Sequence, residues 1–243
     1  MTDTFGTGIL EGKVAFVAGG TRGMNLQIAR RYAEQGAKVA VLSRNAERVD
    51  AAVEELKQIG GEVRGYAGDV RDYDAIDAAM KATATELGNI DLVVAGQAGN
   101  FYAPAADMSA NGFKAVVDID LIGTFNVFRA SYDVLNKRGA SMIAITAPEA
   151  VRPLNFQAHV CAAKAGVIAL TQSAALEYGP TIRVNCVSPG NTYFDGGIWQ
   201  TIEKNMPDLY GSTLKVNPTG RFGTPAEVAA GVVFLSSPVA SRI

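Results

Sequence analysis

A short apolar run that leads into a glycine-rich turn constrains the fold of this chain more than any other feature. Residues 14–18 are apolar, Gly19 and Gly23 follow, and the next segment, Leu26-Gln-Ile-Ala-Arg-Arg-Tyr-Ala, has helical spacing. A buried strand that enters a helix through a tight turn creates an anion site, because the free N–H groups and the dipole of the helix N-terminus favour phosphate. The pattern favours a nucleotide site over a simple turn.

The end of the second apolar run indicates which dinucleotide binds. Residues 37–42 complete a strand–helix–strand unit and are followed by Ser43 and Arg44. A carboxylate at this point would bind the ribose 2′-hydroxyl of NAD, whereas an arginine accommodates the 2′-phosphate of NADP. No carboxylate is present, and Arg22 lies inside the turn. Because arginine pairs with phosphate through two hydrogen bonds, Arg22 and Arg44 predict NADP(H), with solvated surface arginines as the alternative.

Length and composition predict one domain over residues 1–243. The 243 residues are 48% hydrophobic, enough for one α/β core, and the net charge of −2 gives no basic surface for nucleic acid or anionic membranes. No apolar run reaches the length of a membrane span, and the first residues lack a signal-peptide pattern. Two cysteines without metal-type spacing and a single histidine, His159, favour a reduced cytoplasmic protein without a metal site.

Apolar runs and helical segments alternate along the chain, which predicts a Rossmann-type, doubly wound parallel sheet with helices on both faces. The predicted strands are residues 14–18, 37–42, 62–67, 90–95, 141–146 and 182–187. The predicted helices after the first are residues 46–59, 73–87, 109–137 and 156–178, and a last helix begins at Thr224-Pro225. Residues 191–217 are polar, irregular and partly helical, and we predict a lid over the substrate.

Two acidic residues stand out. Asp69 and Val70 follow the third strand, where Asp69 could accept a hydrogen bond from adenine and Val70 could pack on the ring; the alternative is that Asp69 caps the following helix. Asp120 interrupts an apolar helical stripe that contains Val116 and Val127, with no cation on that face. A buried charge is costly unless it is paired or catalytic, so Asp120 is either catalytic or bonded to a neighbouring loop.

Six motifs together resemble the short-chain dehydrogenase/reductase family over essentially the whole chain. They are Gly19-Gly-Thr-Arg-Gly23, Gly68-Asp69-Val70, Ile90-Asp91-Leu-Val-Val, Ala162-Ala-Lys164, Ile182-Arg-Val-Asn-Cys-Val-Ser-Pro-Gly190 and Gly220-Arg-Phe-Gly-Thr-Pro225. The resemblance implies a nicotinamide cofactor, hydride transfer, and a homodimer or homotetramer. The sequence departs from the family at its third glycine, which is Asn25, and at the catalytic Asn, Ser and Tyr, whose positions hold Asp120, Ala147 and Val160. Only Lys164 is retained.

One branch of the family normally lacks the catalytic tyrosine. The segments Gln97-Ala-Gly-Asn-Phe101 and Val117-Asp-Ile-Asp120 are similar to 2,4-dienoyl-CoA reductases of the peroxisomal type, which act in fatty acid metabolism. This resemblance assigns Asn100 to the substrate thioester, Asp120 to proton handling and Lys164 to the nicotinamide ribose. The branch also uses an aspartate in a final Asp-Gly-Gly segment near a seventh strand; the sequence ends at Ile243, before both, so either the sequence is truncated or this tail is absent.

The expected function is therefore NADPH-dependent reduction of an unsaturated acyl thioester, presented on CoA or a similar carrier. The alternatives are a 3-oxoacyl or carbonyl reductase with a substitute proton donor, and a non-catalytic NADP-binding protein. The predicted catalytic residues are Asn100, Asp120 and Lys164. The predicted cofactor site comprises turn residues and residues at the carboxyl ends of the strands: Gly19, Thr21, Arg22, Gly23, Met24, Ser43, Arg44, Asp69, Val70, Ala95, Gly96, Lys164, Pro189, Gly190 and Thr192.

Overall fold

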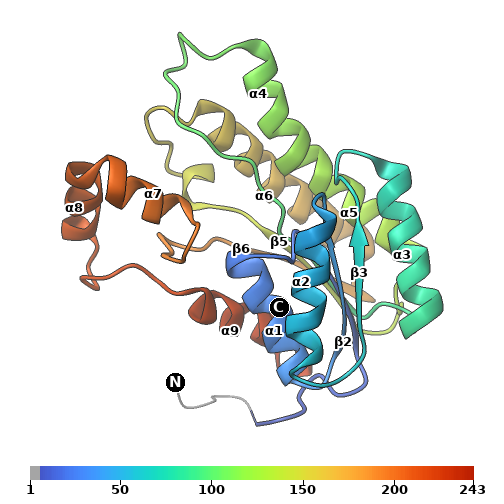
Figure 1. The fold of residues 1–243 in the computed structure, drawn as a ribbon. Coiled ribbons are helices and arrows are strands. Elements are labelled where there is room, and N and C mark those ends of the chain that lie inside the picture. Colours follow the sequence, from blue (N-terminus) through green and yellow to red (C-terminus); the bar gives the residue numbers. More distant parts are fainter. Residues whose placement is uncertain (1–5) are drawn as a thin grey trace.

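The computed structural model describes residues 6–243, and at its centre is a six-stranded parallel sheet (Figure 1). The first residues, from which we argued against a signal peptide, lie almost entirely outside the described part. The strand order is β3-β2-β1-β4-β5-β6, which confirms the predicted doubly wound sheet. The strands are β1 (Val14–Ala18), β2 (Lys38–Ser43), β3 (Val63–Ala67), β4 (Leu92–Ala95), β5 (Ala140–Ile145) and β6 (Ile182–Val187).

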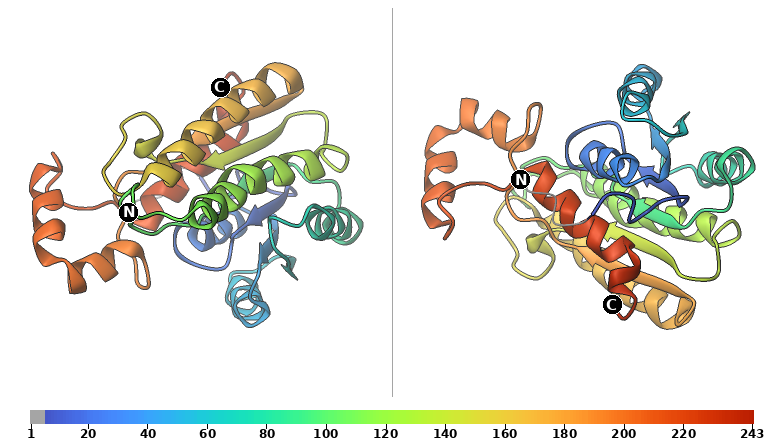
Figure 2. Two further views of the ribbon diagram at one scale, coloured as in Figure 1. Left: turned by 90° about the horizontal axis from the view of Figure 1, so that it is seen from above. Right: turned by 90° about the horizontal axis from the view of Figure 1, so that it is seen from below.

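Helices cover both faces of the sheet (Figure 2). They are α1 (Gly23–Glu34), α2 (Ala46–Lys57), α3 (Tyr73–Leu87), α4 (Ala110–Val117), α5 (Gly123–Tyr132), α6 (Ala158–Tyr178), α7 (Ile198–Asn205), α8 (Pro207–Val216) and α9 (Pro225–Ser236). One core lies between the sheet and α3, α5 and α6, and the other lies between the sheet and α1, α2 and α9. No helix in the described part of the chain is long and apolar enough to cross a bilayer.

The strand β1 shows why the apolar runs are continuous. Phe16 points into the first core and Val17 into the second, as the two-residue period of a strand requires, and both side chains are fully buried. Val17 pairs with Val41 on β2 and with Val94 on β4, so the carboxyl ends of these strands lie at one edge. The connections after β1 and β4 therefore meet there, at the switch point where such sheets bind ligands.

The predicted helix over residues 109–137 is interrupted. It begins after Ser109, whose side chain accepts a hydrogen bond from the Gly112 N–H, and it ends at Tyr132. Between α4 and α5, residues Asp118–Ile122 form a π-helix, with Asp120 at its centre. A single π turn within a helix often marks a functional site, and periodicity alone does not reveal it. The helix predicted from residue 156 begins later, at Ala158, because Phe156 has a positive φ of 66°.

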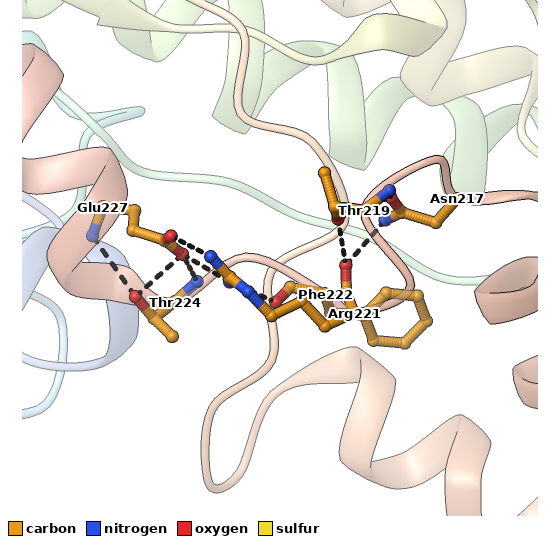
Figure 3. Close-up of polar contacts among 6 residues, drawn as sticks. All are labelled: Asn217, Thr219, Arg221, Phe222, Thr224 and Glu227. Atoms are coloured by element: carbon orange, nitrogen blue, oxygen red, sulfur yellow. Dashed lines mark hydrogen bonds and ion pairs between the residues drawn. The ribbon is translucent and has the colours of Figure 1, made fainter.

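The segment that we predict as a lid, residues 191–217, is mostly helical, in α7 and α8, and backbone hydrogen bonds join its first residues to Gly223, six residues after its predicted end. Tyr193 N donates to Gly223 O at 2.9 Å, and Gly223 N donates to Asn191 O at 2.8 Å. Around this junction, a network of polar contacts runs from Asn217 through Arg221 to Glu227 at the start of α9 (Figure 3). There the Arg221 guanidinium pairs with Glu227, which also completes a capping box with Thr224. The whole segment therefore leaves the body of the protein through one narrow stem.

Candidate active site

Two neighbouring cavities open at the carboxyl edge of the sheet. The smaller one, about 230 Å³, contains nine of the predicted cofactor residues: Gly19, Thr21, Arg22, Met24, Ser43, Arg44, Asp69, Val70 and Gly96. The larger one, about 410 Å³, is lined by Asn100, Pro189, Gly190 and Thr192, and it shares Arg22 and Met24 with the smaller cavity. Four predicted residues line neither cavity: Gly23, Ala95, Asp120 and Lys164.

The smaller cavity has a cationic end. Arg22 and Arg44 line it as predicted, and Arg48 joins them. Our sequence reasoning missed Arg48, although its position four residues after Arg44, at the start of a helix, was a usable signal. Arg44 lies 4.0 Å from Asp69 and its side chain is 63% exposed. Three guanidinium groups around one cavity suit a phosphate monoester.

Asp69 is more constrained than the sequence predicted. Its carboxylate accepts hydrogen bonds from Nε and Nη2 of Arg71, the shortest at 2.6 Å, and from the Arg71 backbone N–H. These contacts lower the pKa of Asp69. The proposed alternative, that Asp69 caps the following helix, is wrong because Asp72 occupies that position and accepts from two backbone N–H groups of α3. An ionised Asp69 held in place can still accept a hydrogen bond.

Asn25 ties the first helix to the end of β4. Its Nδ2 donates to Gly96 O at 2.5 Å. A β-carbon at position 96 would lie 2.3 Å from Asn25 Oδ1, so this asparagine fits because residue 96 is a glycine. The glycine at position 96 thus gives the Asn25 side chain room beside the end of β4. The Oδ1 atom is buried and has no hydrogen-bond partner among the described residues.

Phe194, which sequence reasoning missed, contacts the start of α1. It lines both cavities and packs on Gly23, the first residue of α1, and on Gly197. A β-carbon at Gly23 would lie 2.5 Å from the Phe194 Cε2 atom, and Gly23 has a positive φ of 56°. Gly23 is therefore needed for its conformation and for this contact. The ring covers the helix N-terminus that we predict to bind phosphate.

Asp120 and Lys164, which line neither cavity, form a buried ion pair. Lys164 Nζ lies 3.0 Å from Asp120 Oδ2, and the two side chains are 6% and 0% exposed. This geometry leaves Oδ2 without a well-directed hydrogen bond, whereas Oδ1 accepts from the Gly99 N–H at 2.6 Å. Lys164 Nζ also donates to Ile145 O at 3.0 Å. The structure thus supplies the loop N–H considered for Asp120, and it adds a cation from α6 that the sequence did not indicate.

The environment of Asp120 acts on its protonation in two opposing ways. Burial raises the pKa of its carboxyl group, while Lys164, the Gly99 N–H and His159 act to lower it. Burial also lowers the pKa of His159, against the opposing influence of Asp120. The net result is a carboxyl group whose pKa is raised above its ordinary value, as expected for a proton donor.

The positions that hold the family's serine and tyrosine carry no hydroxyl. Ala147 lines the larger cavity, and Val160 is buried in a small apolar cluster with Val116 and Ala163. None of the described residues that line this cavity is a tyrosine. The described lining of the larger cavity therefore contains no phenol, and the prediction that the site works without one stays a prediction.

The loop after β4 rests on the start of α6. Asn100 lines the larger cavity, and its Oδ1 accepts a hydrogen bond from Gln157 Nε2 at 3.3 Å. Next to it, the ring of Phe101 packs on His159 with 4.2 Å between ring centres. Gln157 and His159 are both buried. Sequence reasoning did not identify Gln157.

Known proteins share this whole architecture. The family model described as enoyl-(acyl carrier protein) reductase matches residues 18–243. The peroxisomal 2,4-dienoyl-CoA reductase of Saccharomyces cerevisiae is 36% identical over 240 residues, which cover 97% of this chain and 81% of the yeast protein. D-threitol dehydrogenase of Mycolicibacterium smegmatis is 35% identical over 237 residues, which cover 96% of this chain and 89% of that one.

A solved structure agrees with the sequence comparisons. A short-chain dehydrogenase from Burkholderia cenocepacia, in complex with NADP, superimposes with a TM-score of 0.87 at 27% identity, covering 96% of this chain and 94% of that one. The present chain has the same fold, with a glycine-rich turn after β1 and the retained Lys164 on α6, and these features lead to the same family. The chain belongs to the short-chain dehydrogenase/reductase family, whose members are oxidoreductases that bind a nicotinamide cofactor.

Proposed function

We propose that this protein is an NADPH-dependent reductase of unsaturated acyl thioesters, of the 2,4-dienoyl-CoA type. The observation that carries the proposal is the buried Asp120–Lys164 pair, which contacts Gly99 next to Asn100, together with a cavity that Asn100 lines and whose described lining contains no tyrosine. A family member without its phenol has lost the usual acid for alcohol–ketone chemistry. The yeast relative, a 2,4-dienoyl-CoA reductase, supports the same substrate class.

The residues present suit a phosphorylated dinucleotide. The free N–H groups at the start of α1 and the three arginines would hold the phosphates, and the unpaired Oδ1 of Asn25 could accept from a cofactor hydroxyl in the same cavity. Lys164 lines neither cavity, so its ammonium group would have to turn from Asp120 to bind the nicotinamide ribose, while the backbone around Pro189, Gly190 and Thr192 would meet the carboxamide. When bound, NADPH supplies the hydride that reduces the δ-carbon of the dienoyl thioester.

Two side chains of this protein would then manage the charge on the substrate. Negative charge moves through the dienolate to the thioester oxygen, where Asn100 can donate a hydrogen bond to it. A proton must reach the α-carbon to complete the product. Because Asp120 lines neither cavity, we propose that it protonates this carbon through a water molecule that it orients. Burial suits Asp120 to this role because it raises the pKa of the carboxyl group.

The activity is tested by following NADPH absorbance with a 2,4-dienoyl-CoA, with a 3-oxoacyl-CoA and without substrate. We expect consumption with the dienoyl thioester. Asn100→Ala should reduce turnover by about 10²–10³-fold, the usual effect of losing one oxyanion donor, and should leave NADPH affinity nearly unchanged. Consumption with the 3-oxoacyl thioester alone would contradict the proposal and favour the carbonyl-reductase alternative, which the similarity to a threitol dehydrogenase keeps open.

The preference for NADPH has its own test. A hydrogen bond to a charged group contributes about 1.5–3 kcal/mol, so Arg44→Gln should weaken NADPH binding by roughly 10–150-fold and leave NADH binding almost unchanged. Arg129→Gln is the matched control, because this arginine is also exposed but lies on α5 in an ion pair with Asp133. Tighter binding of NADH than NADPH by the unaltered protein would refute the cofactor assignment.

The predicted lid, single domain, homo-oligomer and cytoplasmic location remain proposals. The closed stem of residues 191–223 supports a lid that moves as a unit. Exposed apolar side chains on α5 and α6 support association between copies of the chain. Phe125 on α5 is 49% exposed, and Leu176 on α6 is 86% exposed. Light scattering after size-exclusion chromatography would give the number of subunits.

A further inference from the structure

Asn100 is contacted from behind by a residue that has no part in the proposed chemistry. The Asn100 side chain lines the larger cavity, whereas Gln157 lines neither cavity and is only 3% exposed. Gln157 directly precedes α6, and its Nε2 donates to Asn100 Oδ1 at 3.3 Å. The contact joins the loop after β4 to the helix that carries Lys164.

This hydrogen bond determines which end of the Asn100 carboxamide is available. An asparagine side chain has an oxygen that accepts and an NH₂ group that donates. Because Gln157 occupies the oxygen, the NH₂ group remains free for an acceptor in the cavity. A carbonyl oxygen is such an acceptor, and the need for a donor increases as negative charge develops on it.

We infer that Gln157 is a positioning residue that holds Asn100 with its NH₂ group toward the oxygen of the substrate thioester. The inference rests on the proposed function, since it assumes that Asn100 binds this oxygen. Gln157 does not touch the substrate. Its effect is to prevent the Asn100 carboxamide from turning its oxygen toward the developing negative charge.

Other contacts keep the loop in place while Gln157 orients the side chain. Ala103 N donates to Phe156 O at 3.0 Å, and the Phe101 ring packs on His159. Gly99 N donates to Asp120 Oδ1 at 2.6 Å. The backbone on both sides of Asn100 is thus attached to neighbouring elements without help from Gln157. Removing the Gln157 amide should therefore affect the orientation of Asn100 more than the path of the loop.

The buried position of Gln157 offers a second indication. Its Oε1 has no hydrogen-bond partner among the described residues, so the side chain lies in the interior with only its NH₂ group paired. An apolar residue would fill this space without leaving a buried acceptor unpaired. The single bond to Asn100 is the interaction that a polar residue supplies here.

Gln157→Glu tests the inference, because a carboxylate accepts hydrogen bonds but cannot donate one to Asn100 Oδ1. It would instead attract the NH₂ group of Asn100 away from the cavity. We expect kcat with a 2,4-dienoyl-CoA to fall by about 10²-fold, approaching the loss of an oxyanion donor, with little change in KM or in NADPH affinity. Gln172→Glu makes the same change at an exposed position on α6 and should leave kcat unaltered.

Two further variants separate orientation from folding. Gln157→Met removes the donor without introducing a charge, so it should fold normally and lower kcat by a smaller factor than the glutamate variant. In the Asn100→Ala background, Gln157→Glu should cause no additional loss of kcat, because the residue through which it acts is gone. If Gln157→Glu lowers kcat by the same factor in the Asn100→Ala background as in the unaltered protein, Gln157 has a general structural role and the inference is overturned.

The outcomes distinguish this inference from the proposed function. If the unaltered protein does not reduce the dienoyl thioester, the proposed function fails and the inference fails with it. If the unaltered protein is active and both Gln157→Glu and Gln157→Met match it, the proposed function stands and the inference alone is overturned. Reduced kcat at unchanged KM, absent in the Asn100→Ala background, supports both.

Discussion

Replacing Lys164 by methionine should destabilise the protein strongly, because it leaves the Asp120 carboxylate without its cation. Both side chains are almost fully buried, at 6% and 0% exposure. Removing one partner of a buried ion pair typically costs about 3–5 kcal/mol, since the remaining charge stays out of water. In a chain of this size, each kcal/mol lowers the melting temperature by roughly 2–4 °C, so we expect a decrease of roughly 6–20 °C at neutral pH.

The loss should depend on pH in a defined direction. Lys164 acts to lower the pKa of Asp120, so its removal raises that pKa further above 3.8, the ordinary value. A carboxyl group with a raised pKa in the folded state destabilises that state once it ionises. The difference between Lys164→Met and the unaltered protein should therefore be smallest below pH 3.8 and grow as pH rises through the native pKa of Asp120. Thermal unfolding followed by circular dichroism across this range measures it.

The chain contains a matched control in the same region. Lys114 pairs with Asp118, which also belongs to the π-helix, but the Lys114 side chain is 70% exposed. Lys114→Met should cost no more than about 1 kcal/mol, as is usual for surface pairs. Adding Asp120→Asn to Lys164→Met should restore most of the stability, because a neutral amide can still accept from the Gly99 N–H. Equal losses for the two lysine variants, or no recovery in the double variant, would refute the reasoning.

Three further predictions follow from other contacts. Gly96→Ala should lower the free energy of unfolding by about 1–3 kcal/mol through its clash with Asn25, and Asn25→Gly should reverse the loss; an unchanged melting temperature would contradict the contact. The pKa of Glu227 is lowered to about 2, chiefly by Arg221. Its ionised carboxylate therefore stabilises the folded state above pH 4.5, and this stabilisation is lost as the pH falls through about 2. Glu227→Gln should therefore flatten the acid-unfolding profile over that range, and an unaltered profile would show that the pair contributes nothing. Phe194→Ala should strengthen NADPH binding several-fold, because no ring needs to move from the helix N-terminus; titration calorimetry that shows weaker binding would instead indicate that the ring packs on the cofactor.

The sequence was sufficient to predict the fold because its signals are local. Continuous apolar runs such as Val14–Ala18 are typical of strands buried on both faces, and their alternation with helical spacing leaves few topologies. The lining of the smaller cavity was predictable for a related reason. Parallel strands end at one edge, so residues that follow different strands, such as Arg44 and Asp69, had to meet there.

The details that the sequence could not supply depend on contacts between distant segments. The cation beside Asp120 comes from α6, and no pattern around Asp120 indicates it. The π-helix was hidden because one additional residue in a turn does not disturb the apolar spacing enough to be noticed. Phe194 and Gln157 were missed because each acts through the geometry of a neighbour, Gly23 for the first and Asn100 for the second.

The wider turn around Asp120 has a consequence for how α4 and α5 can change together. One additional residue rotates everything beyond it by about 100° relative to a continuous α-helix. With this offset, Val116 can pack beside Val160 while Val127 and Phe128 face the sheet, and the carboxylate between them reaches the lysine. A related chain that lost this residue would gain a regular helix, but it would have to give up either one of those apolar contacts or the buried charge pair.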